Sequence, residues 1–303
     1  MIRIIESPRE GMQGFPLIIP TMEKVRYINQ LLQVGFDVVE VGSRVSSKII
    51  PQMADSMDVV NLLKIKGSRS GRMILATGIR GAELVAAKAE ITHISYPFSF
   101  SPAFLRLNLN TTPEQSLETV ATFTSLCMEQ GKQAVIYVSM AFGNPYSEPW
   151  SQEILAGWVR KLHHAGATTI VLSNVSIELG PLLIFEVYSR LIPVFPGVEF
   201  GLHLHTTNDG WYEQVNAAYM AGCRRFDSVT GGHGGCPMAG EKMMGNLDTR
   251  NLLEFATIKK IAVNIDWKAL EKAYQIEHEI FDLSQPFVRA KEGLTAKSYK
   301  PKP

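Results

Sequence analysis

Cysteine is scarce in this 303-residue chain, and its scarcity bears on where the protein works. The three cysteines, Cys127, Cys223 and Cys236, are an odd number without paired-motif spacing, so we expect no disulfide framework. The sequence opens with MIRIIES, which has no basic segment followed by a long apolar one, and we expect no secretory signal. Both features predict a cytoplasmic protein in a reducing compartment.

An excess of charge and a long hydrophobic run are also missing. The 30 Lys and Arg residues are set against 29 Asp and Glu residues, a net charge of +1 that argues against nucleic acid or an anionic membrane as partner. No apolar run approaches the ~20 residues that span a membrane. With 46% hydrophobic and 19% charged residues, the composition is that of a soluble globular protein. An anionic substrate would therefore need a local cationic site.

What the chain does have is a regular alternation of short β-rich segments with longer amphipathic ones. Eight strands rich in Val, Ile and Leu are expected at residues 2–7, 37–42, 73–78, 91–96, 134–140, 169–174, 199–205 and 224–230. Each is followed by a helical pattern, which is typical of a (β/α)₈ barrel. The alternative, a doubly wound open sheet, usually carries a GxGxxG loop after its first strand, where this chain reads SPREGMQG. We predict an α/β fold, a (β/α)₈ TIM barrel.

One further helix is expected after the eighth unit, within DWKALEKAYQIEHEIFDLSQ at 266–285. No low-complexity linker interrupts the chain before it. We therefore predict a single barrel domain with its C-terminal helix over 1–283 and a polar tail over 284–303, rich in Pro and Lys.

Two histidines stand one residue apart in the seventh predicted strand, within EFGLHLHTTNDGW. Side chains alternate faces along a strand, so His203 and His205 are expected to point one way, and Leu202 and Leu204 the other. Such a pair of imidazoles either binds a divalent metal or forms hydrogen bonds in a polar core.

Other polar residues fall at or just after the carboxyl ends of the predicted strands, where barrels of this kind hold their active sites. They are Arg9, Glu10, Glu40, Ser43, Lys48, Ser139, Asn144, Ser173, Asn174, His233, Cys236 and Asn246. Each one alone is more simply a loop residue that meets solvent. Together they place carboxylates, amides and imidazoles at one end of the barrel. The predicted substrate contacts are Ser43, Lys48, Ser139 and Asn144, although Lys48 equally suits a solvated loop.

Glu10, His203, His205 and Asn246 would supply two oxygen and two nitrogen ligands with no thiolate. Hard oxygens with imidazole favour Mg²⁺ or Mn²⁺, and Zn²⁺ is the less favoured alternative. Arg9 beside this group suits a carboxylate or an enolate oxygen, because its guanidinium is planar and permanently charged. Its alternative is a surface salt bridge.

The segment GGHGGC after the eighth strand ends in Cys236. Its glycines let the backbone approach a ligand, so it could close over the site and deliver a thiol or exclude water. The alternative is a tight turn in which the cysteine packs. Cys127, in an amphipathic helix, and Cys223, before the eighth strand, are predicted to be structural.

Five motifs together resemble one family. They are ESPREGMQG, VVEVGSRVSSKIIPQMAD, VSMAFGNPY, GLHLHTTND and GGCPMAGEKMMGNL. The chain resembles, from its first strand to residue 249, the 3-hydroxy-3-methylglutaryl-CoA lyases of the metal-dependent lyase and Claisen-synthase TIM-barrel superfamily.

The resemblance implies a divalent metal, an acyl-CoA substrate and cleavage to acetyl-CoA and acetoacetate. It implies that Arg9 stabilises the enolate and that Glu40 is an acidic group near the substrate. His203, His205 and Asn246 would be metal ligands, and Cys236 the cysteine of a flexible loop. Barrels of this family tend to dimerise, so a homodimer is a further expectation.

Two positions depart from the family pattern. Glu10 stands in place of an aspartate and is one methylene longer. Asn174 stands where the family has the carboxylate of a GDT-like turn, so a potential proton acceptor is replaced by a neutral amide. His233 in the glycine-rich segment could compensate for it. These departures favour one alternative, a metal-binding homologue with impaired catalysis. The other alternative is the reverse chemistry, a Claisen-condensing acyltransferase that uses acetyl-CoA and an α-keto acid.

Overall fold

Eight parallel strands close into a barrel in the computed structural model, which describes residues 1–174, 179–207, 209–235 and 245–282. The strand order is β1-β2-β3-β4-β5-β6-β7-β9, so each strand pairs with its neighbours in sequence and β9 returns to β1. The strands are β1 (Arg3–Glu6), β2 (Val38–Arg44), β3 (Gly71–Ala76), β4 (His93–Ser99), β5 (Gln133–Ser139), β6 (Thr169–Ser173), β7 (Glu199–His203) and β9 (Arg225–Ser228). The predicted (β/α)₈ barrel is confirmed.

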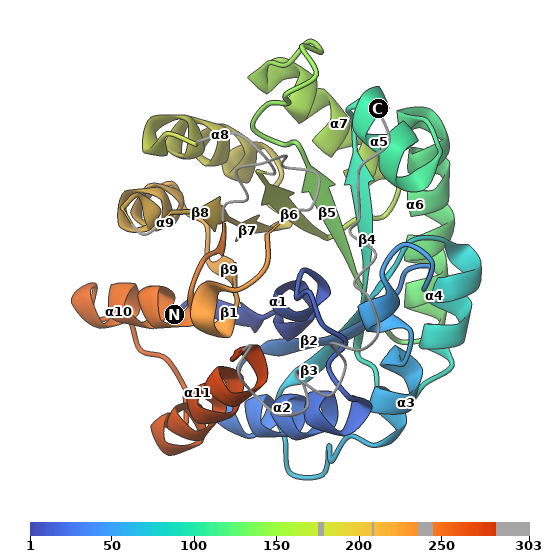
Figure 1. The fold of residues 1–303 in the computed structure, drawn as a ribbon. Coiled ribbons are helices and arrows are strands. Elements are labelled where there is room, and N and C mark those ends of the chain that lie inside the picture. Colours follow the sequence, from blue (N-terminus) through green and yellow to red (C-terminus); the bar gives the residue numbers. More distant parts are fainter. Residues whose placement is uncertain (175–178, 208, 236–244, 283–303) are drawn as a thin grey trace.

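Helices surround this barrel on the outside, whereas the short helix α1 (Pro8–Gln13) lies over its carboxyl end (Figure 1). The other helices are α2 (Thr21–Val34), α3 (Ser56–Asn61), α4 (Ile79–Ala86), α5 (Pro102–Leu109), α6 (Pro113–Glu129), α7 (Gln152–His164), α8 (Pro181–Val194), α9 (Trp211–Met220), α10 (Thr249–Ile258) and α11 (Trp267–Phe281). Two short 3₁₀ turns, η1 (Pro51–Met53) and η2 (Thr230–Gly232), follow β2 and β9. Local signals set several helix starts. One is the capping box of α6, in which Thr112 and Gln115 exchange hydrogen bonds.

β2 and β6 are almost continuously buried, as expected where a parallel sheet is covered on both sides. The larger hydrophobic cluster fills the layer between the strands and the outer helices. A separate small cluster comes from alternate strand positions that face the barrel interior, and its members are Ile5, Val38, Met73, Val135 and Val171. The barrel is therefore a packed core, and open chemistry is left to its ends.

Two features at the carboxyl end of the barrel differ from the sequence prediction. SPREGMQ reads as a loop, yet Pro8 at the first helical position begins the short helix α1 there. The seventh predicted strand is broken after His203, and β8 (His205–Thr206) pairs instead with β10 (Gly245–Asn246) in a separate antiparallel ladder. Both features place extra backbone across this end of the barrel.

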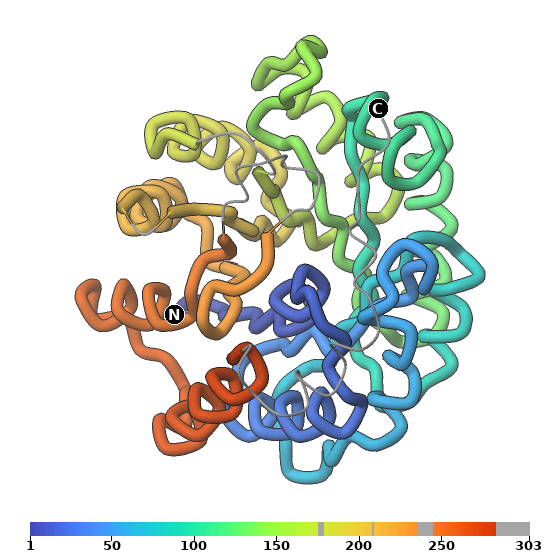
Figure 2. The backbone as a smooth tube through the Cα atoms, in the orientation of Figure 1, coloured from blue at the N-terminus to red at the C-terminus, as the bar shows by residue number. Residues whose placement is uncertain are grey.

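The predicted C-terminal helix is present as α11, which begins at an Asp266 cap and packs against α2. The backbone tube in Figure 2 shows these helices from opposite ends of the chain, one red and one blue, lying side by side. The predicted polar tail, 284–303, lies outside the described residues, and the single-domain boundary stays a prediction. Within the described part of the chain, none of the helices has the length and apolar character needed to cross a membrane.

Candidate functional site

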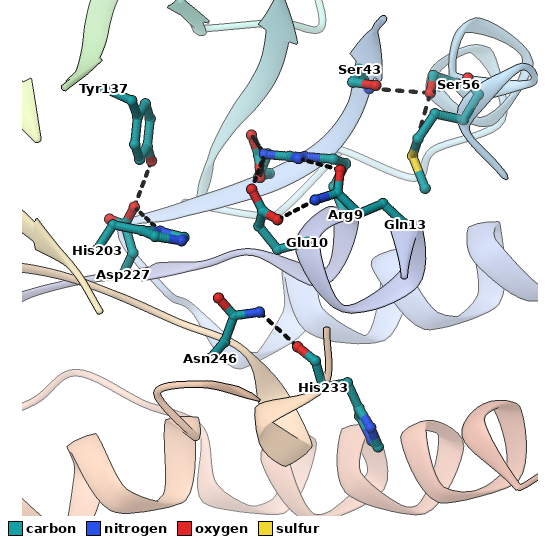
Figure 3. A network of polar contacts seen from close by, with 12 residues as sticks. Arg9, Glu10, Gln13, Ser43, Ser56, Tyr137, His203, Asp227, His233 and Asn246 are labelled. Atoms are coloured by element: carbon teal, nitrogen blue, oxygen red, sulfur yellow. Dashed lines mark hydrogen bonds and ion pairs between the residues drawn. The ribbon is translucent and has the colours of Figure 1, made fainter. Parts of the chain in front are cut away.

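Helix α1 carries a guanidinium into the carboxyl end of the barrel. Arg9 is 5% exposed, and its Nη2 lies 2.9 Å from Glu40 on β2 and 2.7 Å from Oε1 of Glu10. Its Nη1 donates a hydrogen bond to Gln13, 2.8 Å away, and Gln13 in turn donates to Oε2 of Glu10 at 2.5 Å. Figure 3 shows this arrangement, with the Glu10 carboxylate turned toward Arg9 and Gln13.

The charges in this group depend on one another. Burial lowers the pKa of Arg9, but the neighbouring carboxylates of Glu10 and Glu40 raise it further, so Arg9 stays a cation. Burial raises the pKa of Glu10, but the positive charge of Arg9, with a further contribution from His203, lowers it overall. For Glu40 burial prevails over the attraction of Arg9 and raises the pKa to about 7. One cation therefore holds one ionised carboxylate and one that titrates near neutral pH.

The two imidazoles lie on the same side, as the alternation of the strand predicts. The ring centroids of His203 and His205 are 5.1 Å apart with planes at 72°, and Leu204 between them is buried in the hydrophobic core. Burial and the nearby His203 lower the pKa of His205 to about 3, so its ring is neutral. A neutral imidazole is the form that binds a metal ion.

Asp227 on β9 lies beneath His203 and was missed from the sequence. Its Oδ2 lies 3.2 Å from Nδ1 of His203 and accepts a hydrogen bond of 2.6 Å from the hydroxyl of Tyr137 on β5 (Figure 3). Burial lowers the pKa of His203, but the bond to Asp227 raises it above its ordinary value. A carboxylate hydrogen-bonded to Nδ1 orients the ring and leaves Nε2 as the nitrogen available to a ligand. Such a carboxylate is a common outer partner of metal-binding histidines.

Asn246 reaches the same place from β10, where it stands opposite His205 in the short antiparallel ladder. Its Nδ2 donates to the backbone carbonyl of His233, 2.7 Å away. Its Oδ1 and Nδ1 of His205 are buried and have no hydrogen-bond partner among the described residues. Buried polar atoms normally have a partner, so this amide oxygen and ring nitrogen from adjoining strands indicate a place where a missing ligand would bind.

The donor set fits a divalent metal in type, although the ligands do not enclose one point. Among the described residues, no group of three or more His, Cys, Asp and Glu side chains is gathered closely enough to hold an ion. The position of Glu10 explains this, because both its carboxylate oxygens face Arg9 and Gln13. Each oxygen has further lone pairs and can accept more than one partner. The predicted metal site remains a prediction.

Asn174 and His233 contact other groups than those expected from the sequence. The Asn174 amide bridges to the backbone of His205: Nδ2 donates to its carbonyl at 2.8 Å, and Oδ1 accepts from its N–H at 2.9 Å. The ring of His233 turns toward α11, where it stacks on Phe281 and bonds to Glu277. Figure 3 shows it directed away from the cluster formed by Arg9, Glu10, His203 and Asn246. That ring does not reach Asn174, so the geometry gives no support to the expected compensation.

The predicted substrate contacts lie at the same end of the barrel in different settings. Ser43 is buried, its hydroxyl has no partner in the part of the chain that the structure describes, and its backbone N–H donates to the hydroxyl of Ser56. Ser139 accepts a bond at its carbonyl, and Asn144 holds the loop that follows β5 through Glu148. Lys48 is exposed. Cys236 lies outside the described residues. Cys127 and Cys223 are buried free thiols, as expected, and burial raises the pKa of each to about 12.

Comparison with known proteins gives consistent matches over most of the chain. A family model described as HMGL-like matches residues 2–276. Among curated proteins, (R)-citramalyl-CoA lyase of Chloroflexus aurantiacus is 28% identical over 87% of this chain and 86% of its own length. The mitochondrial hydroxymethylglutaryl-CoA lyase of Mus musculus is 32% identical over 83% of this chain and 77% of its own.

Solved structures agree with these matches. An HMG-CoA lyase from Acinetobacter baumannii, in complex with coenzyme A and 3-methylmalate, superimposes with a TM-score of 0.85 at 27% identity and covers 100% of this chain and 98% of its own. The Bacillus subtilis HMG-CoA lyase gives a TM-score of 0.86 at 26% identity, with 95% and 97% covered.

Proposed function

Because the chain belongs to the HMGL-like family of acyl-CoA carbon–carbon lyases, we propose that it cleaves 3-hydroxy-3-methylglutaryl-CoA or a close analogue by a retro-Claisen reaction. The relatives named above act on 3-hydroxy-3-methylglutaryl-CoA and on citramalyl-CoA. These thioesters share a tertiary 3-hydroxyl, a 3-methyl group and a terminal carboxylate, and they differ by one methylene. The products are acetyl-CoA and a keto acid.

One observation carries this proposal. A buried guanidinium, that of Arg9, stands at the same barrel end as two buried polar atoms that have no partner among the described residues, Oδ1 of Asn246 and Nδ1 of His205. A retro-Claisen cleavage needs positive charge at two places, where the hydroxyl loses its proton and where the thioester becomes an enolate. Arg9 supplies the positive charge where the enolate forms, and its planar guanidinium suits an enolate oxygen.

The reaction balances with the groups at this end of the barrel. A carboxylate accepts the proton of the tertiary hydroxyl, and we assign this to Glu10, which is ion-paired with Arg9 at 2.7 Å. The bond between C2 and C3 then breaks, its electron pair forms the thioester enolate, and C3 becomes the ketone. Arg9 offsets the enolate charge, and a proton returned to C2 gives acetyl-CoA. Cys236 or a water molecule is the proposed donor of that proton.

The family generally depends on a divalent metal. Glu10, His203, His205 and Asn246 would hold it here, and their oxygen and imidazole donors favour Mg²⁺ or Mn²⁺ over Zn²⁺. A bound ion of this kind acidifies the substrate hydroxyl and orients the substrate. Asp227 and Asn174 contribute by fixing the ring of His203 and the backbone of His205.

The test is direct. The purified chain with Mg²⁺ or Mn²⁺ is given 3-hydroxy-3-methylglutaryl-CoA and, separately, citramalyl-CoA, and acetyl-CoA is measured together with acetoacetate or pyruvate. We expect cleavage of at least one thioester that stops when the metal is chelated. Incubation of acetyl-CoA with pyruvate or oxaloacetate tests for condensation. Release of free CoA thiol there, without cleavage in the first assay, would establish a condensing enzyme instead.

Two coarser expectations go with this function. We place the enzyme in the cytoplasm, as the scarcity of cysteine predicts, while its relatives include cytoplasmic as well as mitochondrial enzymes. We also expect a homodimer, which light scattering of the purified chain measures directly.

A further inference from the structure

His233 connects the segment after β9 to the C-terminal helix α11. Its ring stacks on Phe281, with centroids 4.0 Å apart and planes at 8°. Its Nε2 is hydrogen-bonded to Oε1 of Glu277, a buried carboxylate on the preceding turn of the same helix. The proposed reaction uses none of these three side chains.

The backbone carbonyl of His233 sets the orientation of the side-chain amide of Asn246, a candidate metal ligand. Its carbonyl accepts the 2.7 Å hydrogen bond from Nδ2 of Asn246. A side-chain amide has a donor end and an acceptor end, so this bond leaves Oδ1 directed to the opposite side, where it is buried and unpartnered among the described residues. The β8–β10 ladder fixes the backbone of Asn246 but not the rotation of its amide. The carbonyl of His233 therefore selects the oxygen, the end that a hard cation binds.

The same contact packs against the segment that carries Glu10. A Cβ placed on Gly11 would lie 3.4 Å from Cβ of His233 and 3.6 Å from the Phe281 ring. Phe281 also meets Phe15 edge-on, with centroids 5.2 Å apart. The stack of His233 on Phe281 thus lies directly behind the residue that follows Glu10, and it touches both segments that supply oxygen ligands.

We propose, resting on the metal dependence of the proposed function, that His233 is a positioning residue through which α11 becomes part of the metal site. Glu277 and Phe281 hold the imidazole, the imidazole fixes its own backbone carbonyl, and that carbonyl presents Oδ1 of Asn246 to the ion. A helix that comes later in the sequence than every proposed ligand thereby helps to set the affinity for metal.

Metal binding without substrate tests this directly. Mn²⁺ is titrated calorimetrically into the metal-stripped full-length chain and its variants, and the unfolding temperature is recorded without metal. We expect His233→Ala to weaken Mn²⁺ binding by about tenfold, the low end for loss of an outer partner of a metal ligand. Glu277→Gln keeps a neutral hydrogen bond and should weaken it about threefold.

The double variant separates a shared route from two independent effects. Because Glu277 acts only through the imidazole, His233→Ala with Glu277→Gln should bind Mn²⁺ about tenfold more weakly than wild type, not thirtyfold. Glu279→Gln is the matched control. It lies on the same helix, is exposed, and pairs with Arg26 on α2 at 2.7 Å. Its Mn²⁺ affinity should stay within about twofold of wild type.

The outcomes distinguish this proposal from the proposed function. Wild-type Mn²⁺ affinity in His233→Ala, with only a lower unfolding temperature, would make the contact purely structural and overturn the positioning role. If His233→Ala does not fold, an unchanged affinity in Glu277→Gln overturns it equally. A wild-type chain that binds no Mn²⁺ overturns both proposals. Weakened Mn²⁺ binding in a chain that cleaves neither thioester would sustain the positioning role and refute the lyase.

Discussion

Each end of the barrel buries an arginine, and the two arginines have very different partners. At the carboxyl end Arg9 has carboxylates of Glu10 and Glu40 at 2.7 and 2.9 Å. At the amino end Arg225, the first residue of β9, lies 3.4 Å from Glu199 and leaves Nε and Nη2 without partners in the described part of the chain. Both side chains are almost fully buried, so burial of a charge does not by itself identify the working end.

What separates the two ends is the kind of segment that carries the unpartnered atoms. Among the described residues, those beside Arg9 include Oδ1 of Asn246 on β10 and Nδ1 of His205 on β8, whereas at the amino end Arg225 on β9 leaves Nε and Nη2, and His93 on β4 leaves Nε2. The carboxyl end is also built from segments added to the strands, α1, β8 and β10, while Arg225 and Glu199 sit on the strands themselves. Unpartnered polar atoms that separate segments bring together around a cation therefore indicate a ligand-binding site.

Arg9→Gln should have the largest effect on turnover, and it tests most sharply whether the carboxyl end of the barrel is the working end. The glutamine lacks the permanent charge that we propose offsets the enolate, and loss of one such stabilising group lowers kcat by about 10³-fold. Steady-state kinetics and thermal unfolding of the same preparation measure both consequences, and we expect turnover to suffer far more than folding. Arg9→Lys keeps the charge without the planar fork and should fall between. A wild-type rate in Arg9→Gln would remove Arg9 from the reaction.

Asn174→Asp probes the amide that replaces a carboxylate of the family pattern. Aspartate can still accept from the N–H of His205 but cannot donate to its carbonyl, 2.8 Å away, and two oxygens would then face each other. We expect kcat/KM to fall about tenfold and Mn²⁺ to bind more weakly, as for other groups that orient metal ligands. Calorimetry and kinetics measure these. Higher activity in the variant would instead show that a proton acceptor at this position is what the chain lacks.

The fold was predictable because the signals for it are local and repeated. Eight Val, Ile and Leu runs alternate with helical patterns, and this alternation, without a GxGxxG loop after the first strand, favours a barrel over an open sheet. Helix α1 was missed because Pro8 and Gly11 read as a loop, although Pro at the first helical position favours a helix. The break after His203 was missed because GLHLH continues the strand pattern, and only pairing with β10 shows where the chain turns.

The site was predictable in part for the same reason. Polar residues after strand ends meet at one end of a parallel barrel, and the structure does bring Arg9, Glu10, Glu40 and the two histidines there. Asp227 could have been found, because it alternates with buried Phe226 and so faces inward. The direction of the His233 ring could not, since its partners on α11 come more than forty residues later along the chain.

Glu6 offers a buried carboxyl at the carboxyl end whose role is in folding. It accepts bonds from the N–H and hydroxyl of Thr230 and from the hydroxyl of Thr249, and burial raises its pKa to about 7 from an ordinary 4.5. The folded protein therefore holds the proton between these values while the unfolded chain has lost it. The free energy of unfolding should fall as pH rises through that interval, by about 2 kcal/mol between pH 5 and 8.

Glu6→Gln removes this titration while keeping the bonds, since its amide can donate to Thr249, whose hydroxyl donates in turn to Ser228. Denaturant unfolding of both proteins at pH 5 and pH 8 should give a smaller loss of stability for the variant. Equal pH slopes in the two proteins would mean that Glu6 stays ionised when folded. The reaction rate at a fixed pH should change little, because Glu6 touches the barrel wall and not the cluster.

Arg225→Met should give the smallest effect, and it completes the contrast between the two ends. The stem of Arg225 lies against Gly201, where an added Cβ would come within 2.9 Å of Cδ, so an unbranched methionine fits the same space. Replacing a poorly paired buried charge with an apolar side chain should raise the free energy of unfolding by about 1 kcal/mol, and Glu199, partly exposed, keeps its partner Arg3 at 2.7 Å. Denaturant unfolding checks the stability, and kcat should stay within about twofold of wild type because no group of the cluster is touched. A fall in kcat comparable to that of Arg9→Gln would mean that both arginines serve the reaction, and unpartnered atoms on segments added to the strands would then not distinguish the working end.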